Sequence, residues 1–108
     1  MTNEAPSKTR RNPRISLPKG MTVAWYGGGM QQTSRVQTLS SGGLSVSSSI
    51  TRPVGSSLML VFEVPGGVVQ AEAIVRRVIP GKEMGLEFTS IGDRARALLD
   101  DLLKRLLR

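Results

Sequence analysis

Apolar and polar residues alternate in a series of short stretches that together cover most of residues 15–89. The clearest is Ser57–Val64, in which every second residue from Leu58 onward is a large apolar side chain. The turn Pro65-Gly66-Gly67 separates it from a second alternating stretch, 68–78, and the two are expected to pair as a hairpin. Alternation with a period of two is typical of β-strands that bury one face. Further strands are expected at 15–26, 35–39, 44–46 and 84–89.

Proline and glycine residues mark the breaks between these stretches. The first strand is expected to be interrupted at Pro18-Lys19-Gly20, because proline lacks the N–H that a sheet ladder needs. Gly27-Gly28-Gly29 is expected to form a turn, Ser40–Gly43 a bulge or tight turn, and 51–57 a loop. No helical pattern separates the strands. This arrangement favours a small antiparallel barrel or rolled sheet of about five to seven strands over an α/β fold.

The period changes near the C-terminus. Ser90, with Asp93 three residues later, is expected to form a capping box, which predicts a helix over 90–108. Leucines recur at helical spacing in this segment, and charged residues occupy the other side, so the helix is amphipathic. The expected role of the leucine face is packing on the barrel, and a dimer contact is the second interpretation.

Composition narrows the classes of function. A chain of 108 residues is long enough for one domain with a hydrophobic core. It contains neither Cys nor His, so thiolate metal sites and an imidazole base for a nucleophilic Ser are absent. The acidic residues match no metal-binding motif. We therefore expect no enzyme activity, no catalytic residue, no metal and no cofactor.

The same composition bears on location and on charged partners. No apolar run approaches the roughly 20 residues of a membrane span, and the N-terminus lacks the apolar part of a secretory signal, so a cytoplasmic protein is expected. The net charge is +7. Residues 1–62 carry seven basic residues and one acid, whereas residues 63–108 carry eight and seven. This asymmetry indicates an anionic partner at the N-terminal side, although basic tails also serve solubility alone.

Two polar segments carry the candidate chemistry. The first is Arg10-Arg11-Asn12-Pro13-Arg14, where proline disfavours helix and arginines four residues apart lie roughly 13 Å from each other in an extended chain. An arginine fork binds phosphate at two points, reads the O6/N7 edge of guanine and stacks on bases. Bent around a compact ligand, Arg10 and Arg14 could hold it from two sides.

The second segment is Thr38-Leu39-Ser40-Ser41-Gly42-Gly43. Thr38 and Ser40 alternate with Leu39, so they are expected to share one face and to offer hydroxyls to a base edge. The two glycines are expected to let a ligand approach the backbone closely. Each segment alone is a weak signal, because basic tails and Ser-Gly turns are common.

Together the two segments resemble the PilZ family, which are receptors for the bacterial second messenger cyclic di-GMP. The family pattern is an RxxxR arm followed by [D/N]xSxxG in a six-stranded antiparallel barrel. Arg10 and Arg14 match the first motif, and Ser40 and Gly43 match the second. Gly85-Leu86-Glu87-Phe88 is similar to the last strand of the family. The resemblance covers residues 10–108.

The resemblance implies a mainly β fold, a small six-stranded antiparallel β-barrel with a C-terminal amphipathic α-helix. It divides the chain into a disordered tail (1–9), a ligand-binding arm (10–14), the barrel (15–89) and the helix (90–108). The implied ligand is cyclic di-GMP, and the response would pass to a separate effector protein. The implied ligand-binding residues are Arg10, Arg11, Arg14, Thr38, Ser40 and Gly43.

One position departs from the family pattern, because Thr38 stands where the family has Asp or Asn. A threonine hydroxyl makes fewer hydrogen bonds to a guanine edge than a carboxylate. An alternative function is therefore a protein-interaction adaptor that keeps the fold without binding the nucleotide. A third hypothesis is a barrel that binds single-stranded nucleic acid. The aromatic residues argue against it, because Trp25, Phe62 and Phe88 are expected in the core and a stacking platform needs exposed rings.

Overall fold

Seven β-strands and one helix make up the part of the chain that the computed structural model describes, residues 15–16 and 20–107. The expected disordered tail, 1–9, and the expected arm, 10–14, lie outside these residues. The elements are β1 (Ile15–Ser16), β2 (Thr22–Gly27), β3 (Met30–Ser40), β4 (Gly43–Ser47), β5 (Ser57–Val64), β6 (Gly67–Ile79), β7 (Glu83–Ile91) and α2 (Asp93–Leu106).

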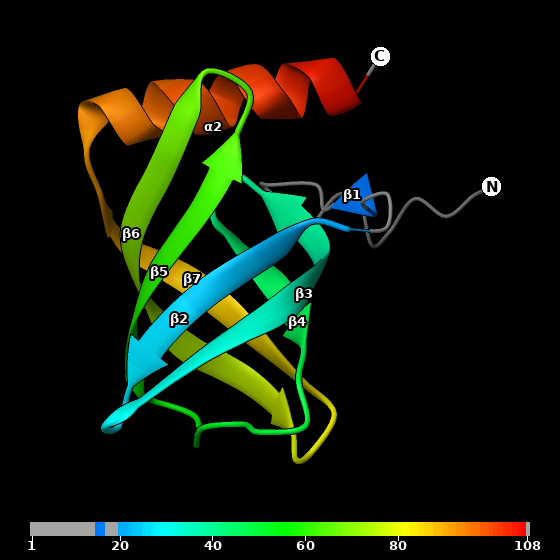
Figure 1. Ribbon diagram of the computed structural model, residues 1–108, viewed down its shortest axis with the longest axis vertical. Helices are drawn as coiled ribbons and strands as arrows, with labels where there is room; N and C mark the ends of the chain where they lie inside the picture. Colours follow the sequence, from blue (N-terminus) through cyan, green and yellow to red (C-terminus); the bar gives the residue numbers. More distant parts are fainter. Residues whose placement is uncertain (1–14, 17–19, 108) are drawn as a thin grey trace, which may run out of the picture.

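Six of the strands close into an antiparallel barrel (Figure 1). The order is β3-β2-β5-β6-β7-β4, and pairing of β3 with β4 joins the two ends of the sheet. The short β1 pairs with the C-terminal end of β3, where Ile15 is the partner of Leu39. This end lies beyond the part of β3, Met30 to Arg35, that pairs with β2. The described residues of the expected first strand belong to two strands, β1 and β2, whereas Pro18 and Lys19, where the interruption was expected, lie outside the described residues. The six-stranded barrel with one C-terminal helix is confirmed.

The barrel interior is filled by the apolar face of each alternating stretch. Val23 and Trp25 of β2, with their counterparts on the other five strands, form one buried cluster. The helix α2 lies across one open end of the barrel (Figure 1). Leu99 and Leu103 of α2 belong to the same cluster. The expected packing of the leucine face on the barrel is confirmed.

The strand β3 is longer than the alternation predicted, because it begins at Met30 rather than near Arg35. In its first half the inward position is polar, and Ser34 is buried there. The indole Nε1–H of Trp25 donates to the Ser34 hydroxyl at 2.9 Å, so this polar group is satisfied inside the barrel. Because Ser34 is polar, this inward-facing part of β3 does not show the alternation of apolar residues from which strands are predicted.

The start of the helix was wrongly predicted. Ser90 is not part of a capping box, because it still lies in β7 and pairs with Glu72 of β6. The helix begins at Asp93, its N-cap is Gly92, and no side chain caps it. The sheet ladder holds Ser90 extended, so the local Ser-x-x-Asp signal is overridden by pairing with a distant strand.

Candidate functional site

Ser41 and Gly42 form a two-residue turn that joins β3 to β4, since Ser40 pairs with Gly43. The Ser40 hydroxyl donates to the carbonyl of Gly43 and accepts the N–H of Gly42, both at 3.2 Å. Ser40 is only 2% exposed. The hydroxyl of Ser40, predicted as a ligand-binding group, therefore stabilises the turn through these two hydrogen bonds.

Gly43 has a packing role that the sequence did not show. A Cβ added there would lie 2.0 Å from the Leu86 carbonyl oxygen and 3.0 Å from the Glu87 Cα. Both are backbone atoms of β7, which pairs with β4 at this point. Glycine is needed here because two strands approach closely.

Thr38 lies next to a bulge in β3, between Val36 and Thr38. Its hydroxyl is 2.7 Å from the hydroxyl of Ser45, the residue that it faces on β4. Thr38 is half-buried, whereas Ser45 is buried. The residue that replaces the family's Asp or Asn is thus integrated into a hydroxyl pair across the two strands.

The arginines of the predicted site, Arg10, Arg11 and Arg14, lie outside the described residues. The nearest described element is β1, which follows them directly in the chain. Its two residues pair with Leu39 and Thr38. The structure therefore brings the segment that follows the arm beside Thr38 and Leu39, next to Ser40 in β3, whereas Gly43 lies on β4 at the other edge of β3. β1 lies at the same end of the barrel as α2 (Figure 1).

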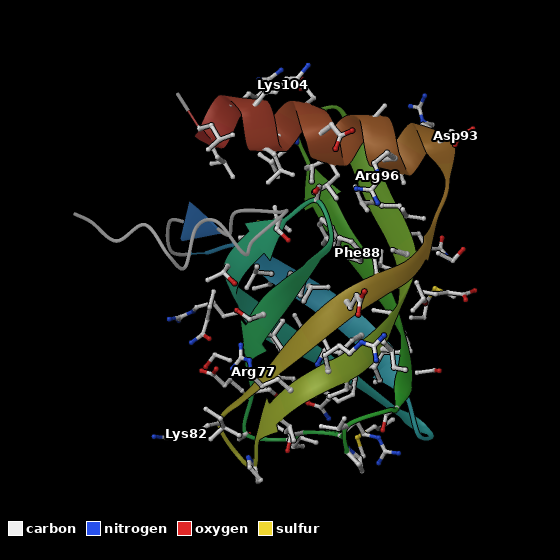
Figure 2. The ribbon with its side chains drawn as sticks, turned by 180° about the vertical axis from the view of Figure 1, so that it is seen from behind. Arg77, Lys82, Phe88, Asp93, Arg96 and Lys104 are labelled. Atoms are coloured by element: carbon white, nitrogen blue, oxygen red, sulfur yellow. The ribbon has the colours of Figure 1, made fainter. Side chains whose placement is uncertain are left out.

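A residue that sequence reasoning missed also touches the turn. Arg96 of α2 donates from Nη1 to the Ser41 carbonyl at 2.5 Å, across 55 positions of sequence. Figure 2 shows its side chain on the side of α2 that faces the barrel. Helical periodicity placed Arg96 on the polar side of the helix together with Arg94, and nothing in the spacing distinguishes the two.

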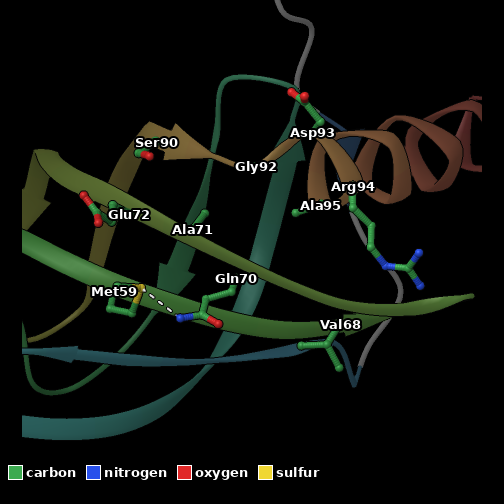
Figure 3. A pocket seen from close by; sticks show the side chains of 10 residues that line it. All are labelled: Met59, Val68, Gln70, Ala71, Glu72, Ser90, Gly92, Asp93, Arg94 and Ala95. Atoms are coloured by element: carbon green, nitrogen blue, oxygen red, sulfur yellow. Dashed lines mark hydrogen bonds between the residues drawn. The ribbon is translucent and has the colours of Figure 1, made fainter.

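A separate pocket of about 490 Å³ lies between the outer face of β5 and β6 and the start of α2 (Figure 3). Its lining includes the carboxylates of Glu72 and Asp93 and the guanidinium of Arg94. None of residues 38–43 lines it. Two carboxylates against one guanidinium disfavour a ligand with two phosphates, so this pocket is not a second version of the predicted site.

Other kinds of chemistry find no support in the described part of the chain. Within it, no group of three or more His, Cys, Asp and Glu side chains is arranged to hold a metal ion. In residues 15–16 and 20–107, no helix has both the length and the apolar character needed to cross a membrane.

Solved structures with the same fold come from several bacteria. The inhibitor of motility MotI/DgrA of Bacillus subtilis is 24% identical, with a TM-score of 0.75 over 91% of this chain and 51% of that chain. The PilZ domain of YcgR from Escherichia coli, solved with c-di-GMP, is 19% identical, with a TM-score of 0.72 over 93% and 92%. PlzA of Borreliella burgdorferi, in complex with c-di-GMP, is 19% identical, with a TM-score of 0.71 over 90% and 42%.

These similarities establish the fold. The chain spans about half the length of MotI/DgrA and less than half of PlzA. Among curated proteins, none matches the chain. The model of the PilZ domain, however, matches residues 8–105, which include both predicted motifs. A barrel closed by β3 and β4, a Ser-Gly turn at its end and a match over nearly the whole sequence lead to one conclusion: the chain belongs to the PilZ domain family.

Proposed function

We propose that this protein is a cytoplasmic receptor for cyclic di-GMP that passes its response to a separate effector protein. The proposal rests on membership of the PilZ family and on the c-di-GMP complexes of the similarly folded YcgR domain and PlzA. In it, residues 10–108 form one ligand-binding domain behind the tail 1–9. The domain binds and signals, and it carries out no reaction.

One observation carries the proposal: β1 pairs with the part of β3 that contains Thr38 and Leu39. Arg14 is bonded directly to Ile15, and consecutive Cα atoms are about 3.8 Å apart. Since Ile15 is the partner of Leu39, we expect Arg14 to lie close to Ser40, the next residue of β3. In this proposal, the arginines of the arm and the polar groups of the turn would bind the same ligand.

The chemistry of cyclic di-GMP fits these groups. Its two phosphates and two guanines suit Arg10 and Arg14, which would clamp it, with Arg11 as an additional phosphate ligand. Ser40, Gly43 and Thr38 would form the barrel side of the site. The closed arm and the ligand would then present a new surface to the effector.

The first test is a calorimetric titration of the whole chain with cyclic di-GMP, with GTP as the control ligand. We expect selective binding at micromolar or lower concentration. Arg14→Ala should weaken binding at least about tenfold, the effect of losing one charge-assisted contact. Arg105→Ala is the matched control, because it removes the same charge from α2, where Arg105 pairs with Asp101. Equal affinity of Arg14→Ala and the wild type would remove the arm from the mechanism.

A second candidate function is an adaptor that keeps the fold without binding the nucleotide. The observation that favours it is Thr38, whose hydroxyl faces Ser45 rather than supplying a carboxylate. Absence of heat with the wild type and an unchanged melting temperature would favour the adaptor. If Thr38→Asp then bound cyclic di-GMP, residue 38 alone would account for the loss.

The structure lacks, in the residues it describes, the exposed aromatic side chains that the nucleic-acid hypothesis requires. Trp25 and Phe62 are buried in the core, and Phe88 packs against it. Tyr26, 38% exposed, is the most accessible aromatic side chain. One partly exposed ring does not provide the stacking platform that single-stranded nucleic acid needs. Salt-dependent binding of any oligonucleotide, without preference for the cyclic dinucleotide, would contradict this conclusion.

A further inference from the structure

The turn between β3 and β4 is held by two other elements besides its own strands. The N–H of Phe88 on β7 donates to the Gly42 carbonyl at 2.9 Å. The guanidinium of Arg96 on α2 donates to the neighbouring Ser41 carbonyl at 2.5 Å. β7 leads into α2 through Ile91 and Gly92. The turn is therefore linked to the helix along the chain and again through one side chain (Figure 2).

The Arg96 contact is well suited to transmit a change. Its side chain is 36% exposed, so the bond to Ser41 is partly shielded from water. A guanidinium has five N–H donors, and its other recorded partner, Asp100 on the same helix, lies 4.0 Å away. The contact with the turn is the short, charge-assisted one. A displacement of the Ser41 carbonyl therefore acts directly on the first turns of α2.

The other cations of the described helix lack an equivalent contact. Arg105 bonds to Asp101, four residues earlier on the same helix. Arg94 is exposed and lines the pocket of Figure 3, to which none of residues 38–43 contributes. Lys104 is exposed near the end of α2. Arg96 is thus distinguished by position rather than by charge.

We infer that Arg96 is a positioning residue that holds the Ser41–Gly42 turn against α2, and that α2 is the element that responds when the turn is occupied. The second half of this inference rests on the proposed function, because it requires a ligand at the turn. Coupling between two sites is reciprocal. A ligand that stabilises the turn therefore stabilises the attachment of α2, and loss of this attachment lowers the affinity for the ligand.

The test is hydrogen exchange of the full chain, followed peptide by peptide, without and with saturating cyclic di-GMP. The variants are Arg96→Ala, Arg96→Lys, which can still donate to a carbonyl, and Arg105→Ala as the matched loss of charge on the same helix. Without ligand, Arg96→Ala should exchange about three- to tenfold faster than the wild type around residues 40–46, as expected for losing a half-exposed charge-assisted bond. Arg105→Ala should leave this region unchanged, and Arg96→Lys should restore most of the protection.

With ligand, exchange in α2 should slow in the wild type, in Arg96→Lys and in Arg105→Ala, but not in Arg96→Ala. The affinity of Arg96→Ala should fall by about three- to tenfold, because the coupling is reciprocal. A melting curve of each variant identifies loss of the fold, and Arg96→Gln, which removes the charge and keeps most of the side-chain length, replaces Arg96→Ala if that variant is unfolded.

The possible failures are distinguishable. Unchanged exchange around residues 40–46 in ligand-free Arg96→Ala would overturn the positioning role, whether or not any ligand binds. Equal slowing of exchange in α2 of Arg96→Ala and of the wild type would show that the response does not pass through Arg96. No slowing of exchange in α2 of the ligand-bound wild type would overturn the role of α2 as the responding element. Absence of any binding to the wild type would refute the proposed function and with it the response of α2, and the ligand-free comparison would still decide the positioning role.

Discussion

Gly43 shows how a single residue serves both the family motif and the barrel. Its missing side chain lets β4 approach the Leu86 carbonyl of β7. The same residue accepts the hydrogen bond from the Ser40 hydroxyl that closes the turn. A substitution at Gly43 is therefore expected to disturb the pairing of β4 with β7, whatever its effect on ligand binding.

At the scale of single residues, we expect Gly43→Ala to lower the free energy of unfolding by about 1–3 kcal/mol, the usual cost of forcing extra atoms into a packed interior. For a domain of this size each kcal/mol lowers the melting temperature by about 4–8 °C. Thermal unfolding followed by circular dichroism measures the effect. Gly92→Ala is the control, because a Cβ there meets no atom within 4 Å, and its cost should stay below about 1 kcal/mol. Equal melting temperatures for Gly43→Ala and the wild type would show that β4 and β7 can separate freely.

At the scale of elements, α2 completes the barrel rather than standing beside it. Leu99 is fully buried, and Leu98 and Leu102 pack against the core cluster from the same face of the helix. A helix of 14 residues is marginal on its own in water. Its stability therefore comes from these apolar contacts with the end of the barrel.

We expect Leu99→Ala to cost about 2–5 kcal/mol, since it removes buried methyl groups and leaves a cavity under the helix. Denaturant unfolding measures the change. Leu107→Ala provides the comparison, because Leu107 is 66% exposed and its truncation should change stability by less than about 0.5 kcal/mol. Similar losses for the two variants would mean that the leucine face does not seal the barrel.

At the scale of the whole molecule, strands and helix share one core. The buried cluster runs from Val23 and Trp25 on β2 to Leu99 and Leu103 on α2 without a division. A single core of this size normally unfolds in one cooperative step.

We therefore expect the fluorescence of Trp25, the single tryptophan, and the far-ultraviolet circular dichroism signal to give the same unfolding midpoint. The first reports on the barrel interior, and the second includes the helix. A helical signal that is lost at lower denaturant than the tryptophan signal would show that α2 unfolds separately from the barrel.

The elements with strict alternation could be predicted closely from the sequence. β5 matches its predicted range, and β6 differs from its range by one residue at each end. The start of β3 was missed because its inward position holds Ser34, and the start of α2 was misplaced because Ser90 is recruited into β7. The start of β3 pairs with the preceding strand β2, and Ser90 pairs with Glu72 of the more distant β6. In both cases hydrogen bonds to another strand decide the outcome, and the apolar pattern of the segment itself carries no information about them.

The candidate site shows a similar division. The candidate residues Thr38, Ser40 and Gly43 were picked out from the sequence, and the structure shows that β1, which follows the arm in the chain, pairs with Thr38 and Leu39. Their roles within the barrel were not predictable, because the hydroxyl of Ser40 and the missing side chain of Gly43 act on atoms brought near by the turn and by β7. Arg96 was not predictable at all, since its partner lies 55 residues away.

The sequence by itself determined which residues face inward, where most chain reversals fall and which family the chain belongs to, because these depend on local periodicity, on glycine and proline, and on short motifs. Only the tertiary structure decided how the barrel closes, where β7 ends and which side chain of α2 holds the β3–β4 turn. The physical reason is that barrel closure and long-range hydrogen bonds arise between segments that are remote in the chain. Their energies exceed the local preferences of residues such as Ser90, and they exist only once those segments have come together.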